Sequence, residues 1–177
     1  MQTSDLCQTR NSEKSEEHGT SKTGGDSAFA RKKILRERKQ MDREQQKTFL
    51  QNIPYIQYNG IVIDQIGMEE SVLHVEMRHE LENPYGMAHG GLLFTLVDTV
   101  GGVTARADGR RYVTLDASIH YLKSGRKGRI TATGHTVRRG RTVTVVDAAV
   151  TDEEKNLLAS GTVTMFCLDA DEKRAEA

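Results

Sequence analysis

A helix-length stretch from Leu92 to Ala105 constrains the fold of this chain more than any other feature. It is built mainly from Leu, Val, Gly, Thr and Ala, and Asp98 is its single charged side chain. A helix that is apolar almost all round belongs inside a protein rather than on its surface. The stretch therefore predicts a central helix that other elements must cover.

Segments with the alternation of β-strands lie on both sides of this helix. Before it, the pattern changes to β-type alternation directly after Pro54: Ile61 and Ile63 share one face of a first segment, and Leu73, Val75 and Met77 share one face of a second. After it, turn residues separate four strands that we expect over residues 111–122, 129–138, 142–151 and 157–168. The apolar helix and the apolar face of the sheet are both removed from water only if the sheet curls around the helix. The sequence therefore predicts an α+β fold.

The two ends of the chain differ from this middle part in composition. Residues 1–27 are mostly Ser, Thr, Glu, Lys and Gly, which predicts a disordered tail. Residues 28–52 contain good helix formers with a basic cluster, which predicts a leading surface helix; nucleic-acid contact or a localisation signal is the alternative. We expect the folded domain over residues 53–168 and a charged C-terminal tail over residues 169–177.

Composition excludes several classes of protein. The chain has 25 Lys plus Arg against 25 Asp plus Glu, so it lacks the basic excess that nucleic-acid binding requires. No stretch reaches the roughly 18 apolar residues of a membrane-spanning helix. Cys7 and Cys167 form no CxxC pair, which argues against a zinc site or a disulfide framework. We expect a cytoplasmic protein with reduced thiols that binds neither nucleic acid nor membranes.

Two features at the central helix are candidates for chemistry. A carboxylate inside an apolar helix is costly unless it is paired, hydrated or functional, which singles out Asp98. Its structural alternative is a buried side chain satisfied by Thr95 or Thr99. Ahead of the helix, His89-Gly90-Gly91 places backbone N–H groups at a helix N-terminus, where developing negative charge is stabilised. The alternative is that the glycines only form a tight loop.

The spacing of these two features limits how they could cooperate. Gly90 and Asp98 are eight residues apart, which is about 12 Å along a helix axis. They cannot both touch one reacting carbon. If both are catalytic, Gly90 must work with Asp98 of a second chain whose helix runs antiparallel beside it, which predicts an isologous dimer with two shared sites.

Several enzyme classes lose their usual support because their motifs are missing. The sequence contains no G-x-S-x-G elbow, Walker loop, G-x-G-x-x-G or H-E-x-x-H. Instead, these residues resemble the hotdog-fold acyl-CoA thioesterases of the phenylacetic-acid-degradation type. The resemblance covers residues 53–168 and is most specific in Asn83-x-x-Gly86-x-x-His89-Gly90-Gly91-x-x-Phe94-x-x-x-Asp98-Thr99. It implies a sheet wrapped around a central helix, dimers and commonly tetramers, and thioester hydrolysis without metal or cofactor.

The resemblance also implies roles for individual residues. Asp98 would act as the nucleophile or as the general base on water, and the Gly90 N–H would polarise the thioester carbonyl. Asn83 and His89 would support the loop and help to orient the carbonyl or the water. Thr114 matches a position where members of the family carry a hydroxyl that can hold the water.

Substrate contacts are expected on both sides of the thioester. Besides Gly91, the acyl group would meet a pocket between helices of two chains, lined by Tyr85, Leu93, Phe94 and Val97. Cations in the turns suit the phosphates of CoA, and these are Lys123, Arg126, Lys127, Arg138, Arg139 and Arg141. The function predicted is hydrolysis of aryl or medium-chain acyl-CoA thioesters.

Two other functions fit the same fold. A non-catalytic acyl-CoA-binding or sensor module would bind the thioester without turnover, but it has no use for a carboxylate at Asp98. A hotdog dehydratase would need a catalytic histidine paired with an acid across the dimer, and His89 could serve. The spacing between His89 and Asp98 favours the thioesterase.

Overall fold

The structure is a computed structural model that describes residues 42–170. The predicted disordered tail, residues 28–41 of the predicted helical extension and residues 171–177 lie outside the described residues. Six strands form one antiparallel sheet in the order β1-β2-β4-β5-β6-β3. The strands are β1 (Ile61–Gln65), β2 (Glu70–Glu76), β3 (Tyr112–Tyr121), β4 (Arg129–Arg139), β5 (Val143–Thr151) and β6 (Leu157–Cys167). The helices are α2 (Arg43–Gln51), α3 (Pro54–Tyr58), the short 3-10 helix η1 (His79–Leu81) and α4 (Gly90–Arg106).

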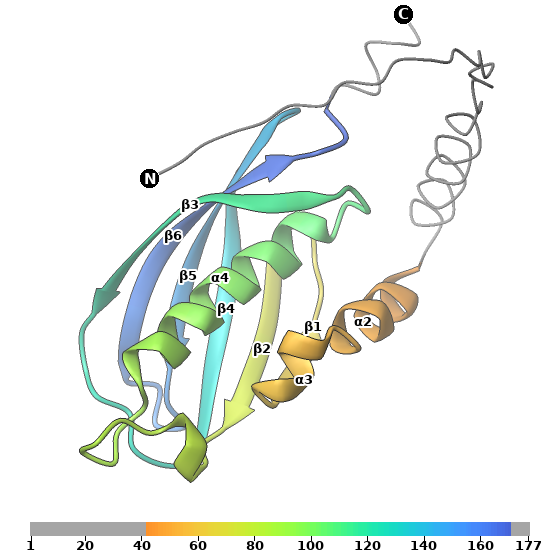
Figure 1. Ribbon diagram of the computed structural model, residues 1–177. Coiled ribbons are helices and arrows are strands. Elements are labelled where there is room, and N and C mark those ends of the chain that lie inside the picture. The colour runs from red at the N-terminus through yellow and green to blue at the C-terminus, as the bar shows by residue number, and fades with distance from the viewer. Residues whose placement is uncertain (1–41, 171–177) are drawn as a thin grey trace, which may run out of the picture.

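The sheet curves around α4, which contacts all strands from β2 to β6 (Figure 1). Leu96 and Val100 of the helix are fully buried against the sheet. Gly161 on β6 allows this close approach, because a Cβ there would lie only 2.8 Å from a methyl group of Val97. The predicted hotdog arrangement is therefore confirmed.

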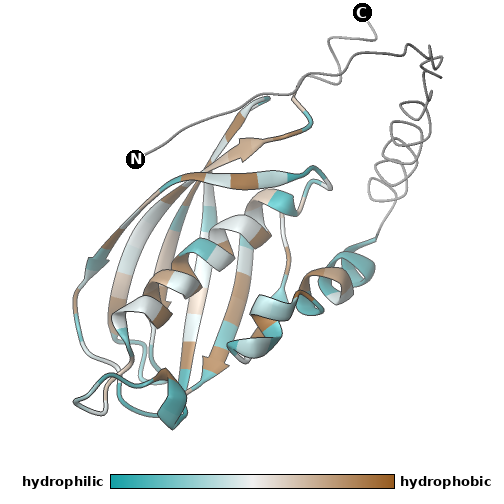
Figure 2. Ribbon diagram, viewed as in Figure 1, coloured by the Kyte–Doolittle hydropathy of each residue, from teal (hydrophilic) through white to brown (hydrophobic). Residues whose placement is uncertain are grey.

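The strands alternate in burial as the sequence predicts. On β5, Val146, Ala148 and Val150 are buried, while the residues between them are not. The same alternation is visible as brown and pale positions along the strands in Figure 2. The four strands that follow α4 each begin and end within one residue of their predicted bounds.

Side chains of α2 close one edge of the sheet. The Gln51 carboxamide donates to the carbonyl of Ile61 and accepts from the N–H of Ile63, both at 2.8 Å. The Lys47 ammonium donates to the carbonyl of Asp64 at 2.9 Å. These bonds satisfy backbone groups of β1 that would otherwise be free to pair with another strand.

Two boundaries differ from the prediction. The chain does not turn directly to β-structure after Pro54, because this proline is the first residue of α3, where its fixed φ suits a helix start. At the other end, Asp169 and Ala170 are buried rather than part of a tail, and the Asp169 carboxylate accepts from the Arg111 guanidinium at 2.6 Å. Over residues 42–170, none of the helices has the length and apolar character needed to cross a membrane.

Candidate active site

The start of α4 is held by the residue just before it. The Nδ1 atom of His89 accepts from the Gly91 N–H at 2.9 Å, and the His89 N–H donates to the carbonyl of Leu81 at 2.9 Å. Gly90 is the first helical residue, so its N–H has no partner within the helix. No other hydrogen bond to that N–H occurs within residues 42–170. It remains available as a donor at the positive end of the helix dipole.

Asn83 shapes the loop that leads into this helix start. Its Oδ1 accepts from the N–H groups of Tyr85 and Met87, at 2.9 and 3.2 Å. Between them, Gly86 has a φ of +67°, a conformation that glycine adopts without strain. The Asn83 side chain thus fixes the loop from inside.

Asp98 lies in the middle of α4 and is half-buried. The hydroxyl of Thr114 on β3 donates to its Oδ1 at 2.7 Å. Neither Thr95 nor Thr99, the helical partners expected for this carboxylate, bonds to Asp98 within residues 42–170. Thr95 is bonded to the Tyr55 hydroxyl at 3.0 Å instead. In the part of the chain that the structure describes, Oδ2 of Asp98 has no hydrogen-bond partner. One carboxylate oxygen is held and the other is free to accept a proton or attack a carbonyl.

Asp98 and Thr114 face a cavity of about 150 Å³. Its walls come from one face of α4, from α2 and α3, and from the start of β3. Its lining residues are Leu50, Ile53, Tyr55, Ile56, Asp98, Thr99, Gly102, Val103, Arg106 and Thr114. The wall is mostly apolar, with the Asp98 carboxylate and the Arg106 guanidinium as its two charged groups, which suits the carbon chain of an acyl group.

Gly90 belongs to a different cavity of about 340 Å³, which Asn83, Leu93 and Tyr121 also line. The Tyr121 hydroxyl donates to the Gly90 carbonyl at 3.2 Å. The structure therefore brings Asn83, His89 and Gly90 together at one end of α4, and Asp98 and Thr114 together farther along. Within one chain it does not bring the two groups to each other, in keeping with the helix rise of about 12 Å between them.

The acyl pocket is expected between the helices of two chains, and a single chain shows only which of the four side chains are placed to line it. Val97 is fully buried and packs into the core at Gly161, so its inclusion was wrong. Tyr85 is 76% exposed and Phe94 is 39% exposed, so their part in a pocket between two chains stays a prediction. Gly91 instead lines a cavity of about 350 Å³. Helix periodicity explains the difference, because Val97 lies on the face of α4 that meets the sheet.

The three arginines of the β4–β5 turn do not form one cluster. Arg138 and Arg141 line a cavity of about 310 Å³. Arg139 turns inward and donates to the carbonyls of Thr104 and Ala105, at 2.9 and 2.7 Å. It therefore satisfies the C-terminal end of α4, which argues against its predicted contact with a CoA phosphate.

Sequence reasoning missed Arg106, the last residue of α4. Its Nη2 donates to the carbonyl of Tyr112 at 2.6 Å, and its Nη1 occupies the space that a Cβ on Gly102 would fill. Burial lowers the pKa of the Arg106 guanidinium from its ordinary value, while the negative charge of Asp98 opposes this shift. Helical side chains point back towards the N-terminus, so the spacing from Asp98 was the signal that could have identified it.

Comparison with known proteins assigns the chain to a family. Residues 85–159 match the family model of the thioesterase superfamily. A Streptococcus mutans protein solved with bound acetyl-CoA is 38% identical, and the match covers 60% of this chain and 87% of that one with a TM-score of 0.58. This chain belongs to the thioesterase superfamily. The assignment agrees with the resemblance that the motif around Asp98 carries.

Two further members of the thioesterase superfamily are similar to this one. A hypothetical thioesterase of Streptococcus pneumoniae, solved with coenzyme A, is 36% identical; the match covers 60% of this chain and 84% of that one with a TM-score of 0.58. The acyl-coenzyme A thioesterase PaaI of Escherichia coli is 28% identical over 55% of this chain and 71% of its own length.

Proposed function

We propose that this protein is an acyl-CoA thioesterase that hydrolyses aryl or medium-chain acyl-CoA to the free acid and CoA. The observation that carries the proposal is the Asp98 carboxylate, held on one oxygen by Thr114 and facing a mostly apolar cavity of about 150 Å³. Its membership in the thioesterase superfamily supports this reaction class. The acyl-CoA thioesterase activity in the name of the Escherichia coli relative supports it further.

The reaction needs an activated oxygen and a donor for the developing oxyanion. A water oxygen attacks the thioester carbonyl carbon, its proton passes to Asp98, and the carbonyl oxygen takes the negative charge beside the Gly90 N–H. The intermediate then collapses, the carbon–sulfur bond breaks and the CoA sulfur leaves with the proton. Direct attack by Asp98, followed by hydrolysis of the anhydride, would use the same free carboxylate oxygen.

Both groups can reach one carbonyl only if two chains share the site. The sheet order leaves β3 at an edge, and over residues 42–170 no element pairs with its outer side. Val113 and Leu115 on this strand are 46% and 62% exposed. The β1 edge, by contrast, is closed by α2. We infer that β3 pairs antiparallel with β3 of a second copy, because a long free edge is a template for pairing.

The contacts of β3 indicate where the two-fold axis would lie. Thr114 near the start of the strand holds Asp98, and Tyr121 at its end holds Gly90. Antiparallel pairing about an axis near Ala117 and Ser118 would bring each Thr114 opposite the partner's Tyr121. Asp98 of one chain would then approach Gly90 of the other, and two equivalent sites would form.

Thiol release from a panel of acyl-CoA esters tests the proposed reaction. We expect the wild-type protein to hydrolyse at least one member of a panel of hexanoyl-, octanoyl-, benzoyl- and phenylacetyl-CoA. Calorimetric titration with the same esters is the parallel measurement. Tight acyl-CoA binding without thiol release would overturn the proposal in favour of the sensor.

Mixed dimers test the shared site. A chain carrying Asp98→Asn and a chain carrying Gly90→Pro, each expected to be nearly inactive alone, are coexpressed with two different tags and purified through both. The mixed dimer then holds one intact site out of two, so about half of the wild-type activity per dimer should return. Activity no higher than that of the parent variants would contradict a site shared between chains.

A further inference from the structure

We propose that Arg106 binds the far end of the acyl group and selects acyl-CoA thioesters whose acyl chain ends in a carboxylate. The inference rests on the proposed thioesterase function and names its substrate class. It is carried by three observations: the shortage of partners for this guanidinium, its place between two cavities, and its distance from Asp98.

Arg106 is the arginine of this pocket that forms no ion pair with a carboxylate among the described residues, although the negative charge of Asp98 lies close enough to act on it. Arg110 and Arg111 line the same pocket, but they form ion pairs with Asp108 at 2.7 Å and with Asp169 at 2.6 Å. Among the described residues, no carboxylate forms an ion pair with Arg106, and the Tyr112 carbonyl is its one hydrogen-bond partner. A guanidinium has five N–H donors, so most of its hydrogen-bonding capacity is left for a ligand or water.

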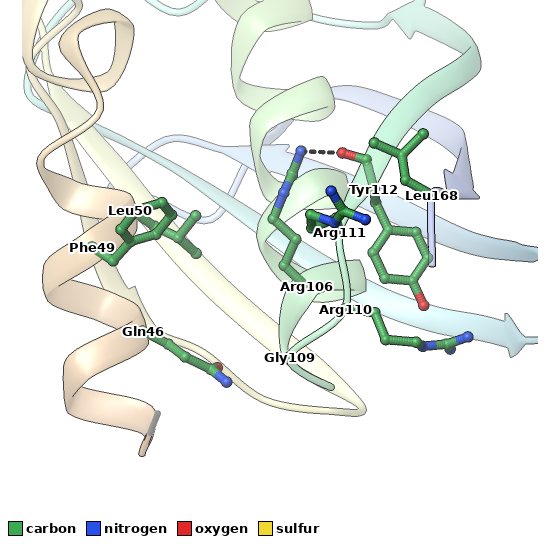
Figure 3. A pocket seen from close by; sticks show the side chains of 9 residues that line it. All are labelled: Gln46, Phe49, Leu50, Arg106, Gly109, Arg110, Arg111, Tyr112 and Leu168. Atoms are coloured by element: carbon green, nitrogen blue, oxygen red, sulfur yellow. Dashed lines mark hydrogen bonds between the residues drawn. The ribbon is translucent and has the colours of Figure 1, made fainter. Parts of the chain in front are cut away.

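Arg106 lies between two cavities. Together with Leu50 it lines both the Asp98 cavity and a larger pocket of about 260 Å³ (Figure 3). The larger pocket has apolar walls from Phe49 and Leu168. Gln46 also contributes to its lining.

The position of the guanidinium sets the length of the acyl group. Because Arg106 folds back over Gly102, its donors lie about one helical turn beyond Asp98, roughly 6 Å along the axis. Five carbon–carbon bonds of about 1.5 Å, laid out in a zigzag, span this distance. The adipoyl group, with its second carboxylate five bonds from the thioester carbonyl, has the required length. A carboxylate also matches the planar fork of a guanidinium with two parallel hydrogen bonds.

A pair of substrates that differ only at the far end tests this inference. Adipoyl-CoA and hexanoyl-CoA have the same chain length, and kcat/KM is measured for both. We expect the wild-type protein to prefer adipoyl-CoA by about tenfold or more, and Arg106→Met to reduce this ratio by a similar factor. Arg129→Met is the control. It removes an exposed guanidinium that pairs with Glu76 on the neighbouring strand and lines neither cavity at Arg106, so it should leave the ratio as in the wild type.

The outcomes separate a binding role from a structural one. If Arg106 only stabilised the end of α4, Arg106→Met would lower both values of kcat/KM equally, and that result would overturn the inference. Should the methionine variant not fold, Arg106→Lys keeps the positive charge but loses the planar guanidinium. Its ratio of kcat/KM for adipoyl-CoA over hexanoyl-CoA should then fall between the wild-type ratio and no preference. If neither adipoyl-CoA nor any ester of the panel above is hydrolysed, the proposed function fails, and the ratio of the dissociation constants of adipoyl-CoA and hexanoyl-CoA from calorimetry still decides the inference. A wild-type preference for a terminal hydroxyl, in 6-hydroxyhexanoyl-CoA, over adipoyl-CoA would also overturn it.

Discussion

Gly90→Pro is expected to lower kcat by about 10²–10³-fold, the usual cost of removing one oxyanion donor. The substitution removes the backbone N–H and little else. Gly90 is the first residue of α4, where proline is well tolerated and where the N–H has no helical partner. The preceding His89 has φ −63° and ψ 138°, the extended conformation that a residue before proline prefers. Thiol release measures kcat, and circular dichroism checks that the helix forms.

Gly90→Ala is the matched control for this variant. It adds a side chain but keeps the N–H, and its Cβ would meet the Tyr121 ring at 3.6 Å, an ordinary contact. We expect the alanine variant to retain most of its activity. Equal losses in the two variants would mean that the space beside Tyr121 matters rather than the hydrogen-bond donor, and the oxyanion role of Gly90 would be lost.

The fold was predictable because its signals are local. Alternation with a period of two placed β3 to β6 within one residue, since buried residues such as Val146 and Val150 recur at every second position. The apolar run around Asp98 predicted α4, because a helix-length run that is apolar almost all round is typical of a buried helix. The short helix α3 was missed because Pro54 reads as a break, although a proline can equally begin a helix.

The site was predictable only where its contacts are close in the sequence. The His89-Gly90-Gly91 turn at the start of α4 is such a case. The partner of Asp98 is not, because Thr114 comes from a strand whose place at the sheet edge depends on the order of all six strands. Alternation states which residues share a face of a strand, but it does not state which strand lies beside which face of a helix.

The sequence also did not predict that Arg139 turns inward, because this too depends on where its strand lies relative to α4. In the sequence it stands between Arg138 and Arg141, and charge alone makes the three equivalent. In the structure the strand alternation separates them, and Arg139 reaches two carbonyls at the end of α4. Its charge therefore serves the helix terminus, and of these three arginines Arg138 and Arg141 remain candidates for CoA phosphates.

Asp98→Asn is the second change with a large expected effect, on the order of a 10²-fold loss in kcat or more. The amide has the shape of the carboxylate, and its oxygen can still accept from the Thr114 hydroxyl. It can neither take a proton from water nor attack a carbonyl, so the loss should fall on kcat rather than on folding. Single-turnover thiol release at saturating acyl-CoA measures the chemical step directly.

Asp147→Asn is the control that matches this change in charge. Asp147 lies on β5, away from the β3 edge, and its exposed carboxylate accepts from the Thr162 hydroxyl at 2.7 Å as Asp98 accepts from Thr114, so its loss should leave kcat within about twofold of the wild type. A fall in kcat for Asp98→Asn alone would support a role in proton transfer or attack on the thioester. If Asp98→Asn kept the wild-type rate, the carboxylate would be a structural partner of Thr114, and the catalytic oxygen would have to come from another residue.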